Sequence, residues 1–75
     1  MNREYEILLG LRIKALRNSR KLTQESVVSQ LQVLGCDITR SALAKIEVGQ
    51  RHVYPDEIRA LKIVLDVDYD DLLPE

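Results

Sequence analysis

The sequence predicts a compact, all-α domain with five helices. Apolar residues recur at intervals of three and four along nearly the whole chain, which is the spacing of one buried helical face. Residue types that favour helix starts precede these stretches, and connections of a few residues separate them. No stretch alternates polar and apolar residues as a half-buried strand does. Helices are predicted at residues 3–19, 24–32, 40–48, 55–65 and 69–73.

The first predicted helix has the longest apolar stripe. Asn2 is placed to cap its N-terminus, and Glu4 and Glu6 in the first turn favour the positive end of the helix dipole. The basic run at residues 17–21 lies at the opposite end, where the dipole favours cations. We expect the buried stripe to contain Tyr5, Leu8, Leu9, Leu11, Ile13, Ala15 and Leu16.

Threonine and glycine mark the limits of the second and third helices. Thr23 and Thr39 each offer a hydroxyl that can accept a hydrogen bond from a free backbone N–H of the first turn. Gly35 and Gly49 follow the same two helices and can adopt the left-handed conformation that ends a helix. The second helix is expected to end near residues 32–34.

Proline and acidic residues start the last two helices. Pro55 suits the first helical position, where no backbone hydrogen bond is lost, and Asp56 and Glu57 follow it. Asp68 is expected to cap the final short turn at residues 69–73.

The composition excludes several classes of protein. The chain of 75 residues has one cysteine and one histidine, too few for an internal disulfide or a structural metal site. One histidine also leaves little material for a nucleophilic catalytic group, so we expect no metal, cofactor or enzymatic activity. Cys36 is expected to pack and His52 to lie exposed in a loop. No apolar run is long enough for a membrane span, and the free thiol suits the cytoplasm.

The charges are unevenly distributed along the chain. Residues 1–52 hold nine basic and five acidic residues, whereas residues 53–75 hold two basic and seven acidic residues. The net charge of −1 therefore conceals a basic part that can attract an anion. Uneven charge is also common in small helical proteins, so this pattern alone does not define a nucleic-acid binder.

The third helix has two unlike faces. Ala42, Leu43 and Ile46 fall on one side of a helical wheel and form a face to be buried. A helix in the DNA major groove needs short side chains near the bases and long donors at its edges. The opposite side meets that description, although a simple solvated face would look similar. The residues on this opposite side of the third helix are Arg40, Ser41, Ala44 and Lys45.

Four stretches of the chain show a common family pattern, and they are residues 9–17, 20–25, 38–51 and 55–73. Together they resemble the Cro/CI-type (XRE) helix-turn-helix family of phage-repressor-like proteins. The resemblance covers nearly the whole chain, residues 9–73, and implies a single domain over residues 1–75 with a lambda-repressor-like arrangement of five helices.

The resemblance also implies roles for individual residues. Residues 24–32 correspond to the positioning helix and residues 40–48 to the recognition helix. The positions that face the bases are Arg40, Ser41, Ala44 and Lys45, and those that contact the DNA backbone are Gln24, Thr39, Gln50 and Arg51. Arg17 and Glu47 correspond to an ion pair that ties the first helix to the end of the third.

Two features depart from the family pattern. Seven residues, 32–38, separate Leu31 from Thr39, which lengthens the usual glycine-based turn by five. Val28 stands where the family prefers alanine at the contact between the two helices. Both changes are expected to open the helix pair.

The resemblance implies a sequence-specific, double-stranded DNA-binding transcriptional regulator, a repressor that binds its operator as a homodimer. The dimer contact is expected near the fourth and fifth helices. The alternative is a protein-interaction module on the same fold, such as an antitoxin-like partner of another protein. The residues expected at the dimer contact are Val53, Tyr54, Val64, Val67 and Tyr69.

Overall fold

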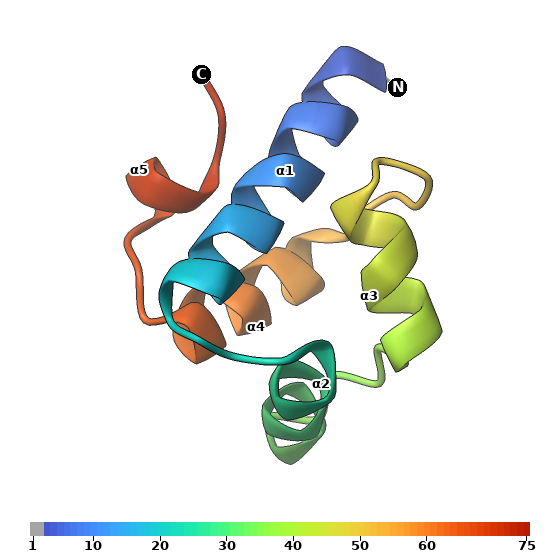
Figure 1. The fold of residues 1–75 in the computed structure, drawn as a ribbon, viewed down its shortest axis with the longest axis vertical. Helices are drawn as coiled ribbons and strands as arrows, with labels where there is room; N and C mark the ends of the chain where they lie inside the picture. The colour runs from blue at the N-terminus through green and yellow to red at the C-terminus, as the bar shows by residue number, and fades with distance from the viewer. Residues whose placement is uncertain (1–2) are drawn as a thin grey trace.

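The computed structural model describes residues 3–75, and this part of the chain folds into five helices without a strand (Figure 1). This confirms the predicted fold class, and the observed helix ends lie within a residue or so of the predicted ones. The expected cap at Asn2 lies outside the described residues. The helices are α1 (Arg3–Ser19), α2 (Gln24–Val33), α3 (Arg40–Glu47), α4 (Pro55–Leu65) and α5 (Tyr69–Leu72).

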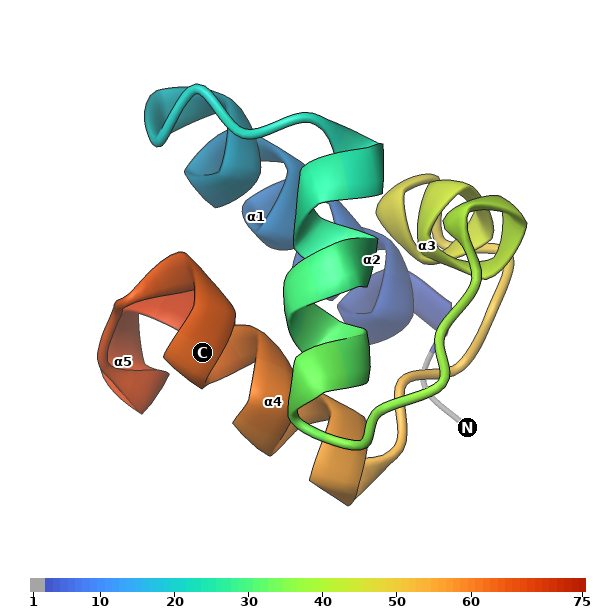
Figure 2. The same cartoon turned by 90° about the horizontal axis from the view of Figure 1, so that it is seen from below.

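The long helix α1 is the centre of the arrangement. It contacts α3 on one side, α4 behind and α5 on the other side, as Figure 1 shows. Helix α2 packs against α3 and α4, and the view from below in Figure 2 places it between them. None of the helices in residues 3–75 has the length and apolar character needed to cross a bilayer.

The core lies where these helices meet. Its most buried side chains come from every helix and from the connection before α3, and they are Leu9, Ile13, Val27, Leu31, Ile38, Leu43, Ile46, Leu61, Leu65 and Leu72. The expected stripe on α1 was too wide. Leu8 and Leu11 are 50% and 54% exposed, and Ala15 is also exposed, because no other helix covers that side of α1.

The threonine caps form as predicted. The Thr23 hydroxyl accepts a hydrogen bond from the Ser26 N–H at 3.0 Å, and the Thr39 hydroxyl accepts one from the Ala42 N–H at 3.1 Å. Asp68 occupies the N-cap position of α5, but its side chain makes no capping hydrogen bond, which corrects the expectation for this residue.

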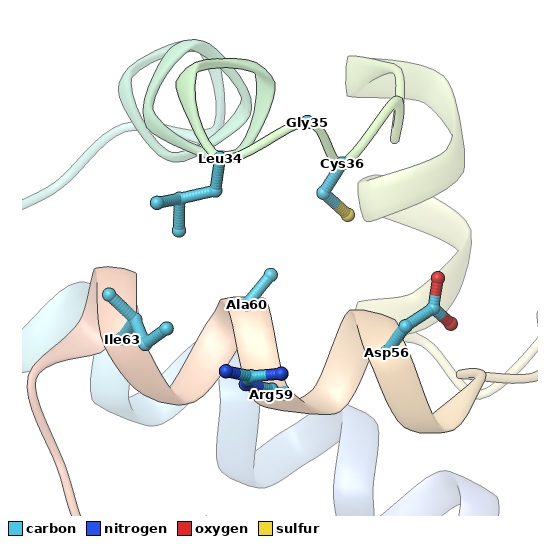
Figure 3. Close-up of a pocket in the computed structure, with 7 residues that line it drawn as sticks. All are labelled: Leu34, Gly35, Cys36, Asp56, Arg59, Ala60 and Ile63. Atoms are coloured by element: carbon cyan, nitrogen blue, oxygen red, sulfur yellow. The ribbon is translucent and has the colours of Figure 1, made fainter.

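The lengthened connection between α2 and α3 is anchored at its middle and its end. The Cys36 N–H donates to the Leu31 carbonyl at 2.9 Å, and Ile38 is only 1% exposed within the core. Figure 3 shows Cys36 beside a groove of about 370 Å³ between the end of α2 and α4. Burial raises the pKa of the Cys36 thiol, which keeps it protonated and suits a packing role.

Helices α1 and α3 approach each other backbone to backbone. A Cβ atom at Gly10 would collide with the carbonyl oxygen of Ile46 in the last turn of α3. Glycine at this position therefore sets the distance between the two helices. The sequence offered no sign of this role, because it depends on how the helices cross.

Several helices end on a residue in the left-handed backbone conformation. Gly35 (φ 80°) and Gly49 (φ 75°) hold this position after α2 and α3, as predicted. Lys21 (φ 57°) holds it after α1 and Asp66 (φ 55°) after α4. Non-glycine residues adopt this conformation at a cost of about 1 kcal/mol or more, because Cβ approaches a carbonyl oxygen.

Replacing Lys21 by glycine is expected to stabilise the protein. Glycine adopts a φ of 57° without steric cost, so Lys21→Gly should raise the free energy of unfolding by about 0.5–1 kcal/mol. Urea denaturation followed by circular dichroism measures the change. Lys14→Gly is the matched control, because the same substitution within α1 should lower the free energy of unfolding by about 1 kcal/mol. Equal losses in both variants would show that Lys21 is not strained.

Candidate nucleic-acid interface

Helix α3 turns one face into the core and the other to solvent. Leu43 and Ile46 are fully buried. Of the residues expected to face DNA bases, Arg40, Ser41 and Lys45 are exposed, and Ala44 in the middle is half-buried. Thr39, at the N-terminus of this exposed face, is exposed as well. The structure therefore brings the expected base-contacting residues together on one accessible surface.

A buried ion pair fixes the carboxyl end of α3 against α1. Arg17 Nε donates to Glu47 Oε2 at 2.7 Å, and Arg17 Nη2 donates to Glu47 Oε1 at 3.0 Å. The side chains are only 11% and 2% exposed. Arg17 also donates through Nη1 to the Leu22 carbonyl at 2.9 Å, which fixes the connection between α1 and α2. The hydrogen bonds to Glu47 raise the pKa of Arg17, so its guanidinium stays charged at neutral pH.

Gln24 belongs to the same buried network. Its Nε2 donates to Glu47 Oε1 at 3.0 Å, so the first residue of α2 is bonded to the last residue of α3. The family resemblance implies only one role for Gln24, a contact with the DNA backbone. In this structure its half-buried amide also closes the corner between the two helices.

An exposed ion pair joins the first turns of α2 and α3. Arg40 Nε donates to Glu25 Oε1 at 2.7 Å, and each side chain is 66% exposed. Sequence reasoning missed this pair, because neither helix taken alone indicates a contact between Arg40 and Glu25. The contact arises from the way α2 and α3 are placed relative to each other.

The loop after α3 contains the other residues expected at the DNA backbone. Gln50 is exposed, and its N–H donates to the Lys45 carbonyl at 2.8 Å. Arg51 is half-buried and bound to Glu57 of α4 through two hydrogen bonds of 2.8 and 3.0 Å. These hydrogen bonds hold the pKa of Glu57 below its ordinary value. Arg51 thus fixes the start of α4, and any phosphate contact would compete with that role.

His52 is more engaged than the sequence predicted. Its Nδ1 lies 2.9 Å from Glu6 Oε1 in α1, and its ring packs edge-on against Tyr54. The contact with Glu6 ties the loop after α3 to the first helix. His52 is therefore half-buried rather than fully exposed.

Comparisons with known proteins identify the family. The family described as a helix-turn-helix domain matches residues 8–75. The DNA-binding domain of BldD superposes with a TM-score of 0.81 and 26% identity, covering 99% of this chain and 100% of that one. The restriction-modification controller protein C.AhdI from Aeromonas hydrophila gives a TM-score of 0.80 and 30% identity, over 93% and 94% of the chains. No curated protein matches the sequence.

This chain therefore belongs to the helix-turn-helix domain family, and within it to the XRE type, as its resemblance to Cro/CI-type proteins implied.

Removing one member of the buried ion pair should destabilise the protein strongly. Glu47→Ala leaves the Arg17 charge buried without its partner, which costs about 3–5 kcal/mol. Chemical denaturation of residues 1–75 measures the loss. Glu25→Ala removes a carboxylate from an exposed pair and should cost under about 1 kcal/mol. Similar losses for the two variants would contradict a structural role for the buried pair.

Proposed function

We propose that this chain is a sequence-specific, double-stranded DNA-binding transcriptional regulator that acts as a repressor in the cytoplasm. Helix α3 enters the major groove in this proposal. The observation that carries it is the exposed face of α3, held outward by the buried pair of Arg17 and Glu47. The structural similarity to the DNA-binding domain of BldD supports the same function.

The side chains on α3 suit base reading by their size and position. Ser41 and Ala44 are short and allow close approach to the base edges. Arg40 and Lys45 are long donors that reach guanine O6 and N7. Thr39 and Gln50 flank this face and contact phosphates in the proposed complex, together with Gln24. Arg51 also contacts a phosphate in this proposal, and there the phosphate replaces part of its bonding to Glu57.

We further propose that the protein binds a palindromic operator as a homodimer. The Cα trace measures 29 × 22 × 20 Å, so two adjacent copies can present their α3 helices about 34 Å apart, one turn of DNA. Of the residues expected at the dimer contact, Val53 is buried and Val64 and Val67 pack against the core. Tyr54 and Tyr69 remain 54% and 42% exposed, and they support a contact on the α4–α5 side.

A second candidate function is a protein-interaction module. Large apolar side chains are exposed on α1 and at the end of α2, including Leu8, Leu11 and Val33, the last of which is 86% exposed. Such side chains suit a protein partner of the antitoxin-toxin kind. Binding to duplex DNA distinguishes the two candidates.

The regulator is expected to bind duplex DNA with strong salt dependence. A dimer that neutralises six or more phosphates should lose about a thousandfold in affinity between roughly 50 and 200 mM salt. Fluorescence anisotropy of a labelled duplex, chosen by selection from a randomised pool, measures this loss. If micromolar protein binds no duplex even at low salt, the regulator function is excluded and the interaction module is favoured.

Substitutions on α3 should alter base preference without unfolding the protein. Arg40→Ala and Lys45→Ala each remove an exposed donor and should reduce discrimination at particular base pairs by about 1–3 kcal/mol. Selection from a randomised duplex pool reveals the preferences of each variant. Arg59→Ala, an equal change of charge on α4, is the control and should leave the preferences unchanged. Unaltered preferences in both α3 variants would remove these residues from base reading.

A further inference from the structure

The exposed pair of Arg40 and Glu25 contributes little to stability. An ion pair between exposed side chains adds little to the free energy of unfolding, because water and salt screen it and two long side chains lose rotamer freedom. Both side chains here are 66% exposed. The pair therefore matters for where it holds the guanidinium of Arg40.

Glu25 engages one edge of that guanidinium and leaves the other free. Its Oε1 accepts from Nε of Arg40 at 2.7 Å. Among residues 3–75, the two Nη atoms of Arg40 have no hydrogen-bond partner. Because the guanidinium is planar and rigid, fixing Nε also fixes the direction of the two Nη donors. Two parallel donors are what bidentate reading of guanine O6 and N7 requires.

The carboxylate of Glu25 is carried by a well-anchored turn. Thr23 caps this turn through the Ser26 N–H at 3.0 Å, and Gln24 donates to Glu47 at 3.0 Å. Glu47 is itself fixed by the buried pair with Arg17. Hydrogen bonds thus tie Gln24 to the buried pair, and the backbone of the capped turn carries this restraint to the adjacent Glu25.

We infer that Glu25 is a specificity-determining positioning residue, which aims the two Nη donors of Arg40 at one guanine of the operator. This inference rests on the proposed function. A carboxylate near DNA repels phosphates of every sequence alike, so it lowers affinity generally. It improves discrimination when it favours the one geometry that suits the correct base, because specificity is a difference between affinities.

A set of variants tests this role by selection from a randomised duplex pool. The variants are Glu25→Gln, Arg40→Ala, their combination, and Asp37→Asn, which removes an exposed carboxylate that does not contact Arg40. Arg40→Ala should reduce the preference at one base pair by about 5- to 150-fold. Glu25→Gln should reduce the preference at that same base pair by about three- to tenfold. This effect is smaller because Arg40 is still present and loses only its fixed orientation.

The combined variant shows whether Glu25 acts through Arg40. We expect Glu25→Gln to change the base preference no further once Arg40 is alanine. Asp37→Asn should keep the wild-type preference and raise affinity for all sequences about equally. Thermal unfolding of each variant should match that of the wild type, since the pair is exposed.

Distinct results would overturn the inference. If Glu25→Gln keeps the wild-type base preference and binds all sequences more tightly, Glu25 acts only as a surface charge. An equal effect of Glu25→Gln with and without Arg40 would show that it acts independently. If the wild type enriches no sequence, the proposed function fails and this inference with it. If Arg40→Ala alters the preference and Glu25→Gln does not, only this inference fails.

Discussion

The buried pair of Arg17 and Glu47 is the interaction on which the arrangement of this molecule depends. Glu47 is the last residue of α3, and its carboxylate accepts from Arg17 in α1 and from Gln24 at the start of α2. Three helices therefore meet at one carboxylate. Charges buried to this degree are costly unless each is paired and hydrogen-bonded, and here both conditions hold. A displaced α3 would leave a charge in the core without a partner, so the pair restricts where α3 can lie.

Close backbone contact completes this restriction. Gly10 of α1 lies against the Ile46 carbonyl near the same end of α3, and a side chain at that position would force the helices apart. The ion pair is an electrostatic constraint and the contact at Gly10 is a steric one, and both act at the carboxyl end of α3. The opposite end is fixed by the Thr39 cap and by Ile38 in the core. A helix held in this way can present a defined face while contributing little more than two large side chains to the core.

The sequence predicted the helices well because their limits are encoded locally. Thr23 and Thr39 supply caps, and Gly35 supplies a left-handed helix end, each within a few residues of the boundary that it determines. Properties that depend on how the helices are placed relative to one another were harder to predict from the sequence. Periodicity alone assigned Leu8 to the buried stripe of α1, although no helix covers that side. The contact of Glu25 with α3 could not be read from either helix alone, since it depends on the lengthened connection between them.

The most direct measurement is a titration of ¹⁵N-labelled protein with the duplex that selection recovers, followed through the backbone amide chemical shifts. The proposed binding mode predicts that the largest changes fall on residues 39–45 and on the first turn of α2, while the amides of α5 change little. Large changes on α4 and α5 with an unaffected α3 would contradict it, because DNA would then bind away from the face that the buried pair of Arg17 and Glu47 holds outward.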